Sequence, residues 1–474
     1  MTATLMIVLS TSVLLLLSVG FSFWISYIDK KAENWTVGGR KLPVYVVAGT
    51  QYATGGMGGG VLVASVGIGY SSGWSALTYN ALYALGVLLL VFLVGWLHKH
   101  NFSTMPDILK KLYGENKFMI ILVTVLAIIL PFGWLCAQLV AFGSLFTSIT
   151  GISVDYLIPI FAVICLLFVL PGGMNSVAWT DFLFGIVILI MTFVSGIYVV
   201  NAAGGWGEIV QSVPSRNVNF PDGLGGAGMY TIFLWIFAIL PGALTNQMSF
   251  QRIYASKSPK VAKQGFIIAA ILGVLSGTWA SVMGISIYTM NPDLGNPELA
   301  AGWLLAQIPV GFMALYAAFI VSTIMSTLSS ALQSVVVNLT KDIYEPFINP
   351  GVSNKKIVRI SRLLTVVIML LSIILALYFP WTLGWMESSY AYSASGLLVP
   401  IFGGFILKNS RLLTKQGAIG SMVVGIISTA IAHLVDTSLP YVIFGLIGSL
   451  ITFIILNFIY KNKEISLETK PKEA

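Results

Sequence analysis

Apolar stretches of about 20 residues follow one another along this chain, and they restrict its fold more than any other feature. A helix of that length crosses a hydrocarbon core of roughly 30 Å. Backbone groups inside a bilayer must bond within the spanning structure, so the choice is between helices and closed barrels, and barrel strands would alternate in polarity. We therefore expect thirteen membrane-spanning helices, at 5–28, 43–70, 73–97, 118–148, 155–172, 177–202, 228–249, 263–289, 312–340, 363–380, 384–407, 417–434 and 440–460.

The composition excludes a soluble protein. Hydrophobic residues make up 57% of the 474 residues and charged residues 9%, whereas soluble domains average about 45–50% and about 25%. No long polar stretch is available to fold as a domain in water. The expected fold class is an all-α integral membrane protein, with the lipid bilayer as its surroundings.

Basic residues are concentrated in every second loop between the expected spans. Of the 25 Lys and Arg residues, 24 lie in these loops or in the C-terminal tail, and Arg216 alone lies on the other side. Cytoplasmic loops carry such an excess, so we expect the N-terminus outside and the C-terminus in the cytoplasm of a cell membrane. Topology thus accounts for the net charge of +8 without a nucleic-acid partner, and it leaves no arginine within a span.

The second expected span contains a glycine-rich stretch at 53–60, with five glycines in eight residues. Each glycine costs a helix about 1 kcal/mol relative to alanine, so we expect the helix to break there. Such backbone at membrane depth frees carbonyl oxygens for a cation and a helix N-terminus for an anionic group. The alternative is a glycine face for close helix packing. The seventh span contains a second expected interruption at Leu240-Pro241-Gly242.

Hydroxyl groups line one side of the ninth expected span. At 100° per residue, Thr323, Ser326, Thr327 and Ser330 share a face, and Ser329 flanks it. This column of uncharged oxygens can replace part of the hydration shell of a sodium ion. The alternative is a helix interface of small residues whose hydroxyls bond back to their own helix.

Two carboxylates lie near span ends. Asp181 begins the sixth span, where a buried carboxylate is a functional candidate and a hydrated one at the boundary is the alternative. Glu387 lies near the outer end of the eleventh span among Trp381, Trp385 and Tyr390. Aromatic rings around a carboxylate can bind an organic cation, although an interfacial aromatic belt around a hydrated Glu would have the same composition.

Catalytic motifs are missing from the sequence. We find neither a phosphate-binding glycine loop followed by Lys-Ser/Thr nor a nucleophile paired with a base. An ATP-driven pump and a membrane enzyme are therefore not expected. The paired interruptions favour a secondary transporter, and a channel or a membrane sensor is a less favoured alternative.

Several short patches, in this order along the chain, resemble the sodium/solute symporter family. They are WTVGGR at 35–40, the glycine-rich stretch, FSTMPDIL at 102–109, GGMNSVAWTD at 172–181, NQMSFQR at 246–252 and KDIY at 341–344. The resemblance implies a LeuT-type fold with inverted repeats at 43–202 and 228–407. An extra helix and cytoplasmic loop (1–42) would precede them, and two C-terminal helices (408–460) and a cytoplasmic tail (461–474) would follow.

The resemblance also implies sodium sites, with one or two Na+ as coupling ions. A first site would use the carbonyls of Thr54, Met57 and Thr323 and the hydroxyls of Ser326 and Thr327; a one-residue slip would replace Thr54 with Ala53. A second site would use Asp181, Ser326, Ser329 and Ser330. Proton coupling through Asp181 is the alternative to a second sodium ion.

The transported solute is less well defined by the sequence. The substrate half of the broken span is nearly bare glycine, and without an arginine in a span we expect a neutral, zwitterionic or cationic small molecule rather than an anionic sugar. We expect one copy of the chain to suffice for transport. The expected substrate-binding residues are Gln51, Thr54, Met57, Gln138, Trp235, Glu387 and Tyr390.

Overall fold

The computed structural model describes residues 3–28, 38–170, 173–410, 412–435 and 437–468. Three segments named above lie outside these ranges. They are 35–37 and residue 172, which belong to two of the sequence patches, and the end of the tail at 469–474. Within them the secondary structure is helical, apart from an isolated β-bridge between Leu42 and Ser256. The all-α class expected from the sequence is confirmed.

Helical elements follow one another along the whole of the described chain. The first part contains α1 (Ala3–Ile28), η1 (Gly38–Arg40), α3 (Val44–Gln51), η2 (Tyr52–Gly56), α4 (Gly59–Ser72), α5 (Ser75–Leu90), α6 (Val94–Lys99), α7 (Met105–Tyr113), α8 (Lys117–Thr150), α9 (Val154–Val169) and α10 (Met174–Ala202). The second part contains α11 (Trp206–Ser212), α12 (Ser215–Val218), η3 (Asp222–Gly225), α13 (Met229–Leu244), α14 (Gln247–Ala255), α15 (Pro259–Met290), η4 (Pro297–Leu299), α16 (Ala300–Gln307), α17 (Val310–Asn338), η5 (Leu339–Ile348), α18 (Asn354–Tyr378), α19 (Thr382–Leu398), η6 (Val399–Gly403), α20 (Gly404–Ile406), α21 (Lys415–Val435) and α22 (Tyr441–Glu468).

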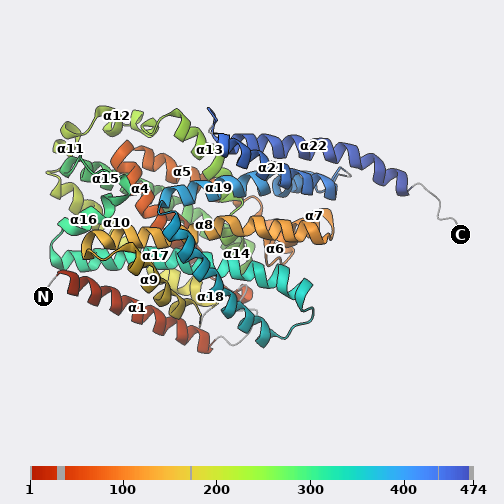
Figure 1. The fold of residues 1–474 in the computed structure, drawn as a ribbon, viewed down its shortest axis with the longest axis horizontal. Helices are drawn as coiled ribbons and strands as arrows, with labels where there is room; N and C mark the ends of the chain where they lie inside the picture. The colour runs from red at the N-terminus through yellow and green to blue at the C-terminus, as the bar shows by residue number, and fades with distance from the viewer. Residues whose placement is uncertain (1–2, 29–37, 171–172, 411, 436, 469–474) are drawn as a thin grey trace.

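The long helices form a bundle with shared direction (Figure 1). In the described ranges, nine helical segments are long and apolar enough to cross a membrane, and four shorter apolar helices accompany them. Each of these segments overlaps one expected span, so the membrane architecture is confirmed, while the count of thirteen crossings stays a prediction. In Figure 1, α1 begins at one end of the bundle and α22 ends at the other, as an odd number of crossings requires.

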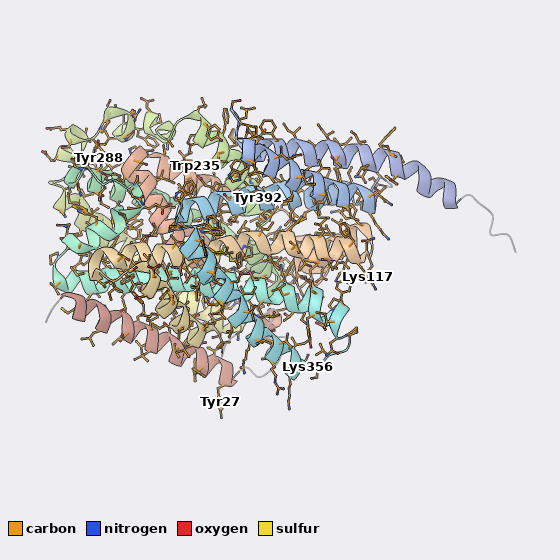
Figure 2. The ribbon with its side chains drawn as sticks, viewed as in Figure 1. Tyr27, Lys117, Trp235, Tyr288, Lys356 and Tyr392 are labelled. Atoms are coloured by element: carbon orange, nitrogen blue, oxygen red, sulfur yellow. The ribbon has the colours of Figure 1, made fainter. Side chains whose placement is uncertain are left out.

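Two lysines at the starts of helices lie at the same end of the bundle. Figure 2 places Lys117, at the start of α8, and Lys356, in the first turn of α18, at the end of the bundle toward which α22 runs. Tyr288, near the end of α15, lies at the opposite end. The basic residues that begin α8 and α18 therefore lie at one end of the molecule.

Helix α17 lies in the centre of the bundle. Its residues from 319 to 338 are all buried, and it packs against α1, α8 and α10. A helix that is buried all round and still carries a hydroxyl column has its polar groups inside protein rather than in lipid. The column can therefore interact with other helices and with ions.

Both expected helix interruptions exist, but one lies at a different position. The glycine-rich span breaks as predicted: a wide π-type turn at η2 is followed by two non-helical residues, Met57 and Gly58, before α4 begins. The predicted break of the seventh span at Leu240-Pro241-Gly242 is wrong, because α13 continues through Pro241 to Leu244. The break comes at Thr245 and Asn246, where the Asn246 side chain caps α14.

Candidate functional site

The broken second span lies directly against α17. Ser326 Oγ lies 2.9 Å from the carbonyl oxygen of Ala53 and 3.1 Å from that of Thr323. Thr327 Oγ1 lies 3.1 Å from the carbonyl oxygen of Thr54 and 3.2 Å from that of Thr323. The two hydroxyls and three carbonyl oxygens thus converge between the two elements, and all five residues are buried.

Glycine makes this approach possible. A Cβ atom added to Gly58 would lie 2.6 Å from the Thr54 carbonyl oxygen and would overlap Thr327 Oγ1. Because the turn at η2 is not continued as a regular helix, carbonyl oxygens in the break are free to point toward α17. Met57 lies in the break, but among the described residues no hydrogen bond joins it to α17.

Four of the five residues expected at the first sodium site are therefore together, and Ala53 joins them. Carbonyl and hydroxyl oxygens are hard, uncharged ligands, which suit a hard cation with low charge better than a transition metal. The donor set fits an alkali cation.

A buried ion pair lies one turn away. Asp181 Oδ2 accepts hydrogen bonds from Thr50 at 2.7 Å, Ser330 at 2.8 Å and Thr54 at 3.2 Å. Arg252 Nη2 lies 3.5 Å from the same carboxylate oxygen, and both charged side chains are at most 1% exposed. Asp181 is thus not hydrated at a boundary but held inside the bundle.

The arginine shares the hydroxyls of Asp181. Its Nη2 donates to Thr54 and Ser330 at 2.7 Å each, and its Nε donates to Thr50 at 3.1 Å. Each hydroxyl then donates to the carboxylate, so the charges are connected through three hydroxyls as well as directly. The other carboxylate oxygen, Asp181 Oδ1, has no hydrogen-bond partner among the described residues.

The expectation that no arginine lies within a span is wrong. Arg252 belongs to α14, which continues the membrane segment Met229–Ala255, whereas the sequence interpretation ends that span at 249. Positive charge marks loops in that interpretation, so a buried basic residue near a span end is counted as cytoplasmic. The available signal is the helical continuation 247–255, which includes part of the NQMSFQR patch.

The second predicted sodium site is only partly assembled. Ser330 contacts Asp181, while Ser326 faces the helix break. Ser329 Oγ bonds back to the carbonyl oxygen of Ser326 at 3.1 Å, and no hydrogen bond of the described residues joins it to Asp181.

Several of the expected substrate-binding residues lie in a second region, where the break meets helices other than α17. Thr54 is not among them, because its hydroxyl belongs to the ion-pair cluster. Gln51 Nε2 lies 3.1 Å from the Tyr83 hydroxyl and from Ser249 Oγ. Gln138 Oε1 accepts from the backbone N–H of Gly60 at 2.8 Å, which anchors α8 to the first turn of α4. The region therefore connects the break to α5, α8 and α14.

Aromatic rings fill this region. Tyr390 packs edge-on against Trp134, with ring centroids 5.6 Å apart, and Trp235 packs edge-on against Tyr79 at 5.3 Å. Trp235 Nε1 donates to Glu387 Oε1 at 2.7 Å. Figure 2 places Trp235 between the two ends of the bundle.

Three buried donors in this region have no hydrogen-bond partner among the described residues: Tyr79 Oη, Trp134 Nε1 and Gln138 Nε2. An unpaired buried donor costs about 1–3 kcal/mol, so such groups are usually satisfied by something. Trp134 and Gln138 are four residues apart on α8 and share a face. This concentration of unpaired donors suits a polar solute.

Comparisons with known proteins agree with this geometry. The model of the sodium:solute symporter family matches residues 35–425. The sodium/glucose cotransporter of Vibrio parahaemolyticus is 24% identical over 93% of this chain and 87% of its own length. The sodium/proline symporter of Escherichia coli K12 is 24% identical, over 87% and 84%.

Among solved structures, a substrate-bound, outward-open, Na+-coupled sialic acid symporter superposes with a TM-score of 0.80 at 18% identity, covering 97% of both chains. The fold is thus the LeuT type that the resemblance implies. The family match covers most of the chain, and the broken helix facing a hydroxyl-bearing helix lies within it. The chain therefore belongs to the sodium:solute symporter family.

Proposed function

We propose that this chain imports a small polar organic solute together with sodium, which binds between the helix break and α17. One observation carries the proposal: the hydroxyls of Ser326 and Thr327 reach across to the carbonyl oxygens of Ala53 and Thr54 at 2.9 and 3.1 Å. Five oxygens without formal charge offer a site for a monovalent cation, and the carbonyl of Met57 is the remaining proposed ligand.

Transport proceeds by alternating access. The site joins two elements that belong to different repeats, so an ion bound there favours the arrangement in which they are close. The solute binds where the break meets helices other than α17, and the bundle then rocks to open toward the cytoplasm. The sodium gradient supplies the work, and no covalent chemistry is needed.

The proposed inverted repeats are 43–202 and 228–407. Each begins with a broken helix: α3, η2 and α4 in the first repeat, and α13 and α14 in the second. Residues 1–42 and 408–460 lie outside this pair, with the tail 461–474 in the cytoplasm and the N-terminus outside.

A second sodium ion at Asp181, Ser326, Ser329 and Ser330 is a further proposal, supported by the partner-free Asp181 Oδ1. The sialic acid symporter is described as having a novel Na+ site. Cooperative sodium activation in wild type that becomes non-cooperative in Asp181→Asn supports two ions. Non-cooperative sodium activation in both proteins counts against a second sodium ion. Activation of uptake by protons at fixed sodium would favour proton coupling instead.

Sodium-dependent stability tests the first site without knowledge of the solute. A ligand that binds only the folded protein at 100 times its Kd stabilises it by about 2.7 kcal/mol. Purified protein should unfold at a higher temperature in sodium than in potassium chloride, and the double variant Ser326→Ala/Thr327→Ala should lose that difference.

Ser322→Ala is the matched control. Ser322 is equally buried on the same helix, but its hydroxyl bonds to Ala318 of α17 itself. The control should keep the sodium response. A full sodium response in the double variant would refute the site.

A further inference from the structure

A separate cavity of about 400 Å³ opens among helix ends. It lies where α13, α19 and α22 begin and α21 ends. Its volume falls within the range of small-molecule sites, about 300–1,000 Å³. By the expected topology it faces the outside of the cell.

A buried carboxylate lies in the wall of this cavity. Glu387 is 8% exposed, and Trp235 holds its Oε1 at 2.7 Å. One carboxylate oxygen is thus fixed by the protein, and the Glu387 side chain lines the cavity.

The charge around the cavity is negative. None of the described residues lining it is Lys or Arg. Glu298 lies at the start of α19, where its carboxylate accepts from the backbone N–H groups of Thr382 and Leu383. The other titratable side chain of note, His433, is stacked on Tyr441 at 4.1 Å and lies 3.2 Å from the Tyr392 hydroxyl. A carboxylate so placed attracts a cation and repels an anion.

Aromatic rings complete the wall: Tyr230, Trp381 and Tyr441 line the cavity with Glu387. Faces of Trp and Tyr attract ammonium groups electrostatically, and quaternary ammonium ligands are commonly bound in this way. A carboxylate combined with aromatic rings, and with no Lys or Arg in the described lining, is suited to an ammonium group rather than to a sugar or a carboxylate.

We propose that Glu387 and the aromatic rings around it form an outer site for an ammonium group, so that the solute is a cationic or zwitterionic amine. The inference rests on the proposed function, since the ammonium group is that of the transported solute. Trp235 is a positioning residue: it holds Oε1 and joins the outer site to the aromatic region beside the helix break. The cavity thus narrows the three solute classes expected from the sequence to the two that carry an ammonium group.

The test measures tryptophan fluorescence and thermal unfolding of the purified full-length protein in saturating sodium chloride. The probes are choline, L-proline, D-glucose and lactate. At least one ammonium-bearing probe, choline or L-proline, should bind more tightly than D-glucose and lactate. Glu387→Gln should weaken that binding at least about tenfold, because it removes the counter-charge. Trp235→Phe should weaken it less, since the carboxylate remains.

Glu208→Gln is the matched control, because Glu208 is an exposed acid of α11 that does not line the cavity, and the expected topology puts it outside the cell as well. It should bind the probes as wild type does. Ammonium probes that bind no more tightly than D-glucose in wild type, or equally well in Glu387→Gln, would overturn the inference. The sodium response measured without any probe separates the two failures, since its loss in wild type refutes the proposed function itself.

Discussion

At the residue scale, Arg252 and Asp181 share the hydroxyls of Thr50, Thr54 and Ser330 at distances of 2.7–3.2 Å. Removing one charge leaves the other buried and uncompensated, which typically costs 3–5 kcal/mol. We expect Asp181→Asn and Arg252→Gln each to lower the free energy of unfolding by about that amount. Denaturant titration of the purified protein measures both values.

The double variant Asp181→Asn/Arg252→Gln is the decisive comparison. It buries no net charge, so it should be less destabilised than the sum of the two single variants, by about 1–3 kcal/mol. Strictly additive losses would mean that the two groups do not interact. The surface pair Lys341–Glu345, at 2.9 Å, is the control, and its loss should cost less than about 1 kcal/mol.

Residue patterns predict the positions of the hydroxyl groups better than those of the charged side chains. The spacing of three, four and seven residues within the hydroxyl column fixes its common face on any straight helix. The structure places the hydroxyls of Ser326 and Thr327 opposite the break. Arg252 is missed because the charge rule assigns basic residues to loops, and burial beside Asp181 depends on a contact between residues 71 positions apart. Ser329 shows a further limit, since a flanking hydroxyl can turn back to its own backbone.

At the element scale, the break depends on the absence of a side chain at Gly58. Its φ of −60° and ψ of 153° suit any residue, so close approach rather than backbone strain requires glycine. Gly58→Ala should push η2 away from α17, because its Cβ would meet the Thr54 carbonyl oxygen at 2.6 Å and overlap Thr327 Oγ1. We expect the sodium concentration that gives half of the thermal stabilisation to rise at least about tenfold.

Gly273→Ala is the control for this substitution. It lies on α15 near Gly56, but the nearest atom to an added Cβ is 3.8 Å away, which is ordinary contact. Its sodium response should equal that of wild type. An unchanged response in Gly58→Ala as well would show that the break and α17 need not approach closely for sodium to act.

Element breaks differ in how visible they are in a sequence. Five glycines in eight residues remove helical preference locally, so the first break could be predicted. At the second break, proline alone is misleading, because a helix can continue through Pro241 when neighbouring helices supply the packing. The chain departs from the helix at Thr245, and Asn246 restarts it by capping α14, a signal that is weak unless the tertiary contacts are known.

At the scale of the whole molecule, apolar length and charge segregation are enough to predict a helical membrane bundle. Every span and every loop contributes to these two signals, so an error of several residues at one boundary does not change the predicted architecture. The cavity beside Glu387 could not be predicted, because it is formed by the ends of helices that are far apart in the sequence.

The orientation follows from the same charge distribution and can be tested with two introduced cysteines. Gly295 is exposed between α15 and α16, and Ser353 is exposed immediately before α18. The native Cys136 and Cys165 are fully buried, so they should add little background. We expect a membrane-impermeant maleimide to label Gly295→Cys in intact cells and Ser353→Cys only after permeabilisation, because α17 crosses the membrane between them.

Each other outcome has a distinct meaning. The reverse pattern would invert the molecule and place the Glu387 cavity in the cytoplasm, where it could not receive a solute from outside. Labelling of both positions from one side would mean that α17 does not cross the membrane. Since α17 carries the hydroxyls of the proposed sodium site through the centre of the bundle, that result would remove the path along which the ion is carried.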